Sequence, residues 1–319
     1  MKSARQGKSP PKPPPEISKR IDLSRRSTST LVELACVLEA GTPKPGNVHP
    51  GQSFDDLTYQ DFVLSAAAIA PVFGKAASRS IGRTVLEAVT ATRKIVGKNT
   101  NLGIILLLAP LAATPRVARK NAGTALGRRE LRSLLRQRLA ALTRRDAKHF
   151  YEAIRLASPG GMGTVEEGDL RNTPTGSVLE MMALARRRDL IARQYCSAFR
   201  EVLDEGLPAL ARALARGLEL EQAVILCHLS FLSKHGDSLI ARKCGAAASR
   251  EAARRARQVV EANWPAGRGS NRRLSALDRW LRSDGNKRNP GTSADLTAAV
   301  LFLALGSGII QGPLVLPYK

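Results

Sequence analysis

The sequence predicts one all-α domain of about a dozen helices, preceded by a disordered basic tail. Apolar residues recur at helical spacing through most of the chain, while alternating strand patterns are nearly absent. Hydrophobic residues make up 43% of the 319 residues, a normal share for a globular protein, and this excludes disorder of the whole chain. There is no internal repeat and no linker long enough to divide the chain. Residues 28–319 are therefore predicted to form a single domain.

The predicted elements follow one another in a simple order. Residues 1–27 hold eight Lys or Arg, two acids and many prolines without apolar periodicity, which indicates a solvated tail. A first helix follows, with Leu31, Leu34 and Leu38 on one face. A second helix opens at Thr58, which has the spacing of a capping box with Asp61. Further helices are predicted over residues 76–96, 100–114, 127–141, 144–157, 176–204, 206–216, 219–233, 236–262, 271–283 and 292–307.

The net charge of +23 favours polyanionic ligands. Two stretches carry most of it: residues 116–148 contain eleven basic and two acidic residues, and residues 242–288 contain thirteen and four. A nucleic-acid-binding helical protein is therefore one hypothesis. Against it, the chain has 13 aromatic residues without aromatic–basic interleaving, no zinc-finger spacing and no clear helix-turn-helix signal. An arginine-rich solvated surface is the simpler interpretation.

Membrane insertion and export are not expected from the sequence. No apolar run approaches the roughly 20 residues that span a bilayer, since the longest, Leu102 to Ala113, is interrupted by Pro110. The basic N-terminal segment lacks the apolar core of a signal peptide. The pair Arg25-Arg26 precedes an amphipathic helix, which argues against a twin-arginine signal. We expect a cytoplasmic protein.

Four junctions rich in Gly, Pro, Asn or Asp place polar groups beside helix ends. The first runs from Thr42 to Pro50, where prolines stiffen the turn and Lys44 supplies a point charge suited to phosphate; it continues to Asp56. The second, residues 98–103, places three small polar residues before the most apolar helix. Helix N-termini attract anions, although rigid turns and caps also explain both segments.

The other two junctions add carboxylates. In residues 235–245, Asp237 begins a helix whose next turns present Ser238 and Arg242 on one face. In residues 289–296, Thr292 and Asp295 have capping-box spacing, and the same loop suits a nucleotide phosphate with its metal. None of the four junctions is a Walker loop or a dinucleotide fingerprint, and no third His or Cys completes a zinc site.

In combination and order, the junctions resemble the triphosphoribosyl-dephospho-CoA synthase family, over about residues 31–305. The resemblance rests on Pro43-Lys44-Pro45-Gly46, Asn99-Thr100-Asn101-Leu102-Gly103, Gly236-Asp237 with Ala241-Arg242-Lys243-Cys244-Gly245, and Asn289-Pro290-Gly291-Thr292-Ser293-Ala294-Asp295-Leu296. Intermediate segments that agree are Tyr151-Glu152-Ala153-Ile154-Arg155, Pro159-Gly160-Gly161-Met162-Gly163 and Arg188-Asp189-Leu190-Ile191-Ala192.

The resemblance implies an all-helical enzyme of coenzyme synthesis. Characterised bacterial members use ATP and 3′-dephospho-CoA: the ribose 2′-hydroxyl of dephospho-CoA attacks the anomeric carbon of the ATP ribose, and adenine leaves. The product is the precursor of the prosthetic group on the acyl carrier protein of citrate or malonate decarboxylase.

The chain departs from those members at two of the junctions. Where they typically carry Asn-Thr-His-Lys-Gly, it has Asn99-Thr100-Asn101-Leu102-Gly103, and Asp237 to Gly245 replaces their Asp-Thr-Asn-Val-Ala-Ser-Arg-Gly-Gly. The continuation after Gly46 and the segment from Asn289 to Thr292 look more like an archaeal-type branch. For that branch, a role in methanopterin- or methanofuran-type one-carbon cofactor synthesis is the alternative function.

The reaction that the resemblance implies requires particular chemical groups, and candidate residues for them can be named. Loss of adenine develops oxocarbenium character, which a carboxylate stabilises, and a general base contributes about 10²–10⁴-fold. Mg²⁺ would accompany ATP, held by one or two carboxylates and by phosphate oxygens. The predicted catalytic residues are Asp237, Asp295 and Asp189, and the predicted metal ligands are Asp237, Asp295 and Asp56.

The predicted substrate contacts come from all four junctions. They are Lys44, Gly46, Asn47, Thr100, Asn101, Ser238, Arg242, Lys243, Asn289, Gly291, Thr292 and Ser293. The partners expected are ATP and dephospho-CoA or a related cofactor precursor, with nucleic acid only through the basic surface.

Overall fold

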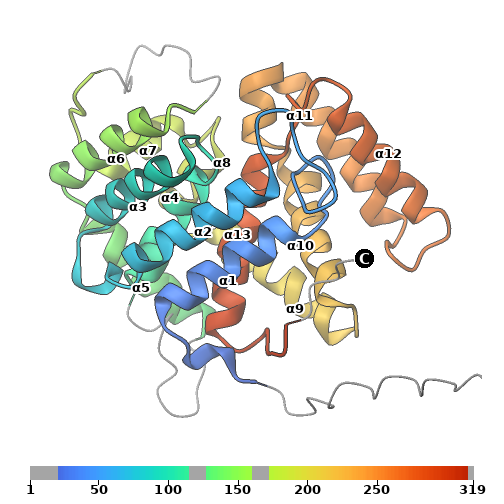
Figure 1. Cartoon of the computed structure of the whole chain (residues 1–319), viewed down its shortest axis with the longest axis horizontal. Helices are drawn as coiled ribbons and strands as arrows, with labels where there is room; N and C mark the ends of the chain where they lie inside the picture. The colour runs from blue at the N-terminus through green and yellow to red at the C-terminus, as the bar shows by residue number, and fades with distance from the viewer. Residues whose placement is uncertain (1–20, 115–126, 160–171, 315–319) are drawn as a thin grey trace, which may run out of the picture.

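The computed structural model describes residues 21–114, 127–159 and 172–314. This part of the chain is all-helical, which confirms the predicted fold class (Figure 1). Its α-helices are α1 (Thr28–Gly41), α2 (Tyr59–Phe73), α3 (Ile81–Val96), α4 (Leu102–Ala112), α5 (Arg128–Ala140), α6 (Arg144–Ala157), α7 (Val178–Ala185), α8 (Leu190–Ser197), α9 (Leu207–Ala215), α10 (Leu220–His235), α11 (Ser238–Glu261), α12 (Ser270–Arg282) and α13 (Gly291–Gly306). Three shorter helical segments are the 3₁₀ helices η1 (Leu23–Arg25) and η2 (Ala76–Ser78) and the π-helix η3 (Val202–Gly206).

The fold is built around α13, which passes through the middle of the molecule (Figure 1). Fourteen of its sixteen residues are buried, as expected of a helix that is apolar on every side. Helix α4, the most apolar of the described helices, has nine of its eleven residues buried and packs against α13. Helices α1, α2 and α3 pack in chain order on one side of this core, and α10, α11 and α12 do so on the other. The N-terminal ends of α4 and α13 are thereby held together by the core.

Several helix ends follow the local signals. The capping box at Thr58 is confirmed: its N–H donates to Asp61 Oδ2 at 2.8 Å, and the Asp61 N–H donates to Thr58 Oγ1 at 3.4 Å. The capping box predicted for Thr292 and Asp295 is wrong. Helix α13 begins one residue earlier, at Gly291, with Pro290 at its N-cap and no side-chain cap. The Asp295 carboxylate is therefore left available for another use.

The long helix predicted over residues 176–204 is wrong. It is divided into α7, α8 and η3, because Asp189 caps a new helix by accepting the Ala192 N–H at 2.9 Å. It is divided again at Ala198 and Phe199, which both have positive φ. The helix predicted over residues 236–262 is also kinked, at Gly245 with φ of 86°. Apolar periodicity continues through these breaks, so it does not reveal them.

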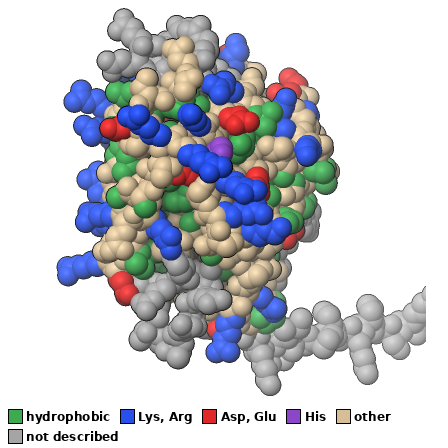
Figure 2. Space-filling view, turned by 90° about the vertical axis from the view of Figure 1, so that its left-hand side faces the viewer, with side chains coloured by type: hydrophobic (Ala, Val, Ile, Leu, Met, Phe, Trp, Pro, Cys, Tyr) green, Lys and Arg blue, Asp and Glu red, His purple; other side chains and the backbone are tan. Residues whose placement is uncertain are grey.

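The predicted tail is mostly outside the described residues. Its last residues, 21–27, belong to the folded body: Leu23 is buried, and Ile21 forms a β-bridge with Gly312. None of the described helices combines the length and the apolar character needed to cross a membrane. Figure 2 shows many Lys and Arg side chains exposed on one face of the molecule, in keeping with the basic composition.

Candidate functional site

A cavity of about 1100 Å³ lies where the four junctions meet. The first turns of α8, α11 and α13 form one end, together with the C-terminal end of α1 and the loop that follows it. Helix α4 contributes to both ends, with Gly103 beside Asp295 and with Leu102 and Leu106 at the other end. The sides of α6 and α7 form the other end. Such a volume is at or above the upper end of the usual range for small-molecule sites, about 300–1,000 Å³, so the cavity has room for a large ligand or two ligands.

Most of the predicted site residues line this cavity. They are Asn47, Asp56, Thr100, Asp189, Ser238, Arg242, Lys243, Asn289, Gly291, Thr292 and Asp295. Residues far apart in the sequence therefore come together in one cavity. The predicted residues that do not line the cavity are Lys44, Gly46, Asn101, Asp237 and Ser293.

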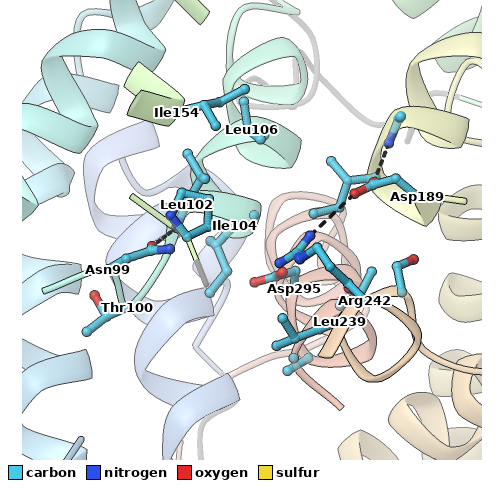
Figure 3. Close-up of a pocket in the computed structure, with 18 of the residues that line it drawn as sticks. Asn99, Thr100, Leu102, Ile104, Leu106, Ile154, Asp189, Leu239, Arg242 and Asp295 are labelled. Carbon is cyan, nitrogen blue, oxygen red and sulfur yellow. Dashed lines mark hydrogen bonds and ion pairs between the residues drawn. The ribbon is translucent and has the colours of Figure 1, made fainter. Parts of the chain in front are cut away.

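The N-terminal ends of α8 and α11 are tied together at the charged end of the cavity. The Leu190 N–H donates to Ser238 Oγ at 2.8 Å. Arg242 Nη1 lies 3.9 Å from Asp189 Oδ2, while Asp189 Oδ1 caps α8. Figure 3 shows Arg242 and Asp295 projecting into the same space. Lys243 is exposed at this end, so two cations from one turn of α11 face the cavity.

Asp295 is the most unusual carboxylate of the cavity. None of the described residues forms a hydrogen bond or an ion pair with its carboxyl group. The charge of Arg242 acts on it only from a longer distance. Burial raises the pKa of Asp295 well above its ordinary value, and the charges of Glu39, Asp237 and Asp189 raise it further, while Arg242 lowers it. A raised pKa favours the protonated form of the carboxyl group, which is the form that can donate a proton.

A glycine of α4 makes room for this carboxyl group. A Cβ atom added to Gly103 would lie 2.0 Å from Asp295 Oδ2 and 2.4 Å from its Cγ. Any side chain at position 103 would therefore occupy the place of the Asp295 carboxyl. The close approach of α4 to α13 explains why the junction after Asn99 ends in glycine.

The structure corrects the expected role of Lys44. Its side chain is fully buried, with Nζ 2.9 Å from Glu39 Oε1. Nζ also donates to the backbone carbonyls of Glu39 and of Thr42. The proline-rich turn thus folds back on the end of α1, and Lys44 cannot reach a phosphate in the cavity. Its partner Glu39 does line the cavity and was missed by the sequence analysis.

Asp237 also lies behind the cavity wall. It is 1% exposed. Its Oδ1 accepts the N–H groups of Leu239 and Ile240 at 2.9 and 3.2 Å, and its Oδ2 accepts the N–H and Oγ–H of Ser293 at 2.8 and 2.9 Å. Burial raises the pKa of Asp237, against the effect of these hydrogen bonds. Asp237 and Ser293 therefore join α11 to α13 and position the cavity residues next to them.

Gly46 and Asn101 serve packing as well. The Gly46 N–H donates to Asp278 Oδ1 at 2.7 Å, and a Cβ atom there would lie 2.8 Å from Leu281 Cβ. Asn101 is buried, and its Oδ1 accepts the Thr92 hydroxyl at 3.1 Å. These contacts hold two of the junctions in place beside the cavity.

The remaining polar junction residues are linked in pairs. Asn47 Nδ2 donates to Asn289 Oδ1 at 2.6 Å, which ties the first junction to the fourth. The hydroxyls of Thr100 and Ser65 are 2.5 Å apart. Thr292 is nearly buried but lines the cavity at the start of α13.

The carboxylates expected to hold a metal do not form a cluster. In the described ranges, no group of three His, Cys, Asp or Glu side chains could hold a metal ion. Asp237 uses both of its oxygens in hydrogen bonds, and Asp56 is exposed at the cavity rim, where Lys98 Nζ donates to its backbone carbonyl at 2.7 Å. A metal ion at this site would depend mainly on ligands that the substrate brings.

The other end of the cavity is mostly apolar, although Arg155 of α6 also lines it, and this apolar wall was not predicted from the sequence. Leu102, Leu106 and Ile154 project into it (Figure 3). Phe150, Tyr151, Val178, Met181 and Met182 complete this wall. The amphipathic pattern of residues 144–157 was a usable signal, but it does not distinguish a face that packs from a face that lines a cavity.

Comparisons with known proteins show similarity to one protein family and to a solved structure. Residues 25–311 match the model of the CitG family, described as ATP:dephospho-CoA triphosphoribosyl transferase. The fold is similar to a crystal structure from Archaeoglobus fulgidus, described as that of a candidate triphosphoribosyl-dephospho-CoA synthase. The two share 30% sequence identity with a TM-score of 0.57, over 76% of this chain and 98% of the other. No curated protein matched the chain.

Proposed function

The chain belongs to the ATP:dephospho-CoA triphosphoribosyl transferase family, and we propose that it moves the triphosphoribosyl group of ATP to a ribose hydroxyl of dephospho-CoA with release of adenine. The observation that carries this proposal is the carboxyl of Asp295, which has no hydrogen-bond or ion-pair partner among the described residues, in a cavity that also receives Arg242 and Lys243. A group transfer at ribose needs a proton donor and a cationic polyphosphate site together.

The triphosphate binds at the charged end in this proposal. Arg242 and Lys243 neutralise phosphate oxygens, and the N-terminal end of α13, with Thr292, adds a favourable dipole. Mg²⁺ enters as part of the ATP complex, coordinated mainly by phosphate oxygens and water. Asp56 at the rim is the exposed cavity carboxylate that can assist it.

Asp295 acts as the general acid. Adenine leaves with the electron pair of its bond to the anomeric carbon, so it needs a proton as the bond breaks. The raised pKa of Asp295, caused by burial and by nearby carboxylates, favours the protonated form that can supply it. Gly103 keeps the carboxyl in the cavity.

The apolar end favours an acceptor with a sizeable apolar part. Leu102 lines this end. It occupies the position at which the characterised bacterial members typically carry Lys. This observation supports a second candidate: the same transfer to another cofactor precursor, as in methanopterin- or methanofuran-type synthesis. Both candidates share the nucleotide chemistry and differ only in the acceptor.

Adenine release tests the proposed function. The protein is incubated with Mg²⁺-ATP and dephospho-CoA, then with pterin and furan precursors, and free adenine and the adduct are measured by chromatography and mass. We expect stoichiometric adenine and adduct with one acceptor, and a loss of about 10²–10⁴-fold in the Asp295→Asn variant. Absence of adenine with every acceptor contradicts the proposal.

Thermal shift separates the transferase from a nucleic-acid-binding protein. Mg²⁺-ATP at 100 times its dissociation constant should add about 2.7 kcal/mol of stability. If no nucleotide stabilises the protein while RNA binds with a steep dependence on salt, the basic nucleic-acid-binding alternative is favoured instead.

A further inference from the structure

Glu39 combines two features that no other carboxylate of the described cavity lining shares. It lines the cavity, yet it is only 3% exposed. Its Oε1 is paired with the fully buried ammonium of Lys44 at 2.9 Å. Glutamate and lysine are almost never buried unless they are paired. A buried ion pair at the wall of a ligand cavity therefore calls for an explanation beyond stability.

The other cavity carboxylates are less suited to accept a proton. Asp189 uses Oδ1 to cap α8 and places Oδ2 toward Arg242. Asp56 is exposed at the rim. In the described part of the chain, no cation contacts Asp295 directly, and Asp295 is suited to donate a proton. Glu39 is an anion balanced by Lys44 and shielded from bulk water.

Glu39 and Asp295 line the same cavity, and the charge of Glu39 acts on Asp295. Helix α1 packs directly against α13, and among the charges that raise the pKa of Asp295, that of Glu39 has the largest effect. Two neighbouring carboxyl groups with different environments, one beside a cation and one without, are a common basis for dividing acid and base roles.

We propose that Glu39 is the general base that takes the proton of the attacking acceptor hydroxyl, and that Lys44 is a positioning residue that holds it. This inference rests on the proposed function. The hydroxyl proton moves to the free oxygen of Glu39 as the acceptor oxygen bonds to the anomeric carbon of ATP. The bond from that carbon to adenine breaks, its electron pair goes to adenine, and Asp295 donates the proton that adenine gains. Proton exchange with solvent then restores both carboxyl groups.

The role of Lys44 follows from its three contacts. Nζ binds Glu39 Oε1 and the carbonyls of Glu39 and Thr42, so it fixes the carboxylate against the end of α1. One carboxylate oxygen is thereby occupied, and the second, which has no partner among the described residues, remains for the acceptor. The stiff Pro43-Lys44-Pro45 turn serves to place this cation.

The test must separate catalysis from folding, because Glu39→Gln alone leaves Lys44 buried without its counter-ion. The double variant Glu39→Gln/Lys44→Met removes both charges, and such neutral replacements of a buried pair are often tolerated. The readouts are adenine release, the KM for ATP, the thermal shift with Mg²⁺-ATP and the melting temperature. We expect a near-native melting temperature and ATP shift with kcat lowered about 10²–10⁴-fold.

A second, more conservative variant tests the proposal even if the double variant does not fold. Glu39→Asp keeps the charge and the partner but withdraws the carboxylate by one methylene. We expect kcat to fall about 10²-fold, the scale of a 1 Å misplacement, with KM for ATP unchanged. Near wild-type kcat in either variant overturns the proposal, as does a loss of kcat that merely follows a loss of ATP binding. If the wild-type protein releases no adenine, the proposed function fails first and this inference fails with it.

Discussion

Replacing Gly103 by alanine tests the contact on which the geometry of Asp295 depends. The added Cβ atom would lie 2.0 Å from Asp295 Oδ2 and 2.8 Å from Ile191 Cδ1. The second contact involves the end of a flexible side chain, which can move away. The first involves the short Asp295 side chain on the rigid, buried α13, so either the two helices separate or the carboxyl rotates out of its place.

The magnitude follows from two opposing effects. Forcing an extra methyl into a packed contact typically costs 1–3 kcal/mol, that is about 2 kcal/mol here. Alanine in place of glycine in a helix raises the free energy of unfolding by roughly 0.5–1 kcal/mol. We therefore expect Gly103→Ala to lower the free energy of unfolding by about 1 kcal/mol in the wild-type background. In the Asp295→Ala background the obstacle is absent, so the same substitution should stabilise by roughly 0.5–1 kcal/mol.

The assay is a double-mutant cycle in urea, combined with adenine release. Gly74→Ala is the matched control, because Gly74 has helical φ and ψ at the end of α2 and its added Cβ would meet ordinary contacts from 3.4 Å. If the carboxyl rotates instead of the helices separating, stability is kept but kcat should fall about 10²-fold. Additive effects of the two substitutions on stability, together with wild-type kcat in Gly103→Ala, would refute the reasoning.

Three further variants test other parts of the site. Asp237→Asn should lower the free energy of unfolding by about 1–3 kcal/mol, because its amide would face the Ser293 donors; an unchanged urea midpoint would contradict the joining role. The folded-state pKa of Asp295 is raised above 3.8, so wild-type protein should lose stability relative to Asp295→Asn as pH rises from about 4 toward 7, as urea unfolding at several pH values would show. Arg242→Met should raise the KM for ATP roughly 10- to 100-fold, whereas the exposed Arg254→Met on the same helix should not.

Much of the fold was predictable because its signals are local. Apolar spacing indicated most of the helices, and the Thr58 capping box set the start of α2. The predictions failed where local signals were overridden. The apolar pattern of residues 176–204 runs through the breaks at Asp189 and Ala198, which depend on a cap and on positive φ. The capping box expected at Asp295 did not form, since α13 starts from the preceding loop.

Part of the cavity lining was predictable from the sequence, but the roles of its residues were not. The junctions that meet at the cavity were identified from their composition and order, and residues such as Arg242 and Asp295 do line it. Lys44 and Asp237 have the residue types that bind phosphate and metal, yet they bind Glu39 and Ser293 instead. The sequence alone does not show whether the partner of a charged residue is a ligand or another side chain.

The sequence by itself determined that the chain is helical, and its family-like junctions indicated which loops carry polar chemistry, because helix periodicity and turn residues act over a few neighbouring positions. The tertiary structure alone decided which carboxyl groups reach the cavity, because burial and pairing arise between residues such as Glu39 and Asp295 that are 256 positions apart. Electrostatic interaction and desolvation depend on distance in space, and the packing of α1, α4 and α13 sets those distances.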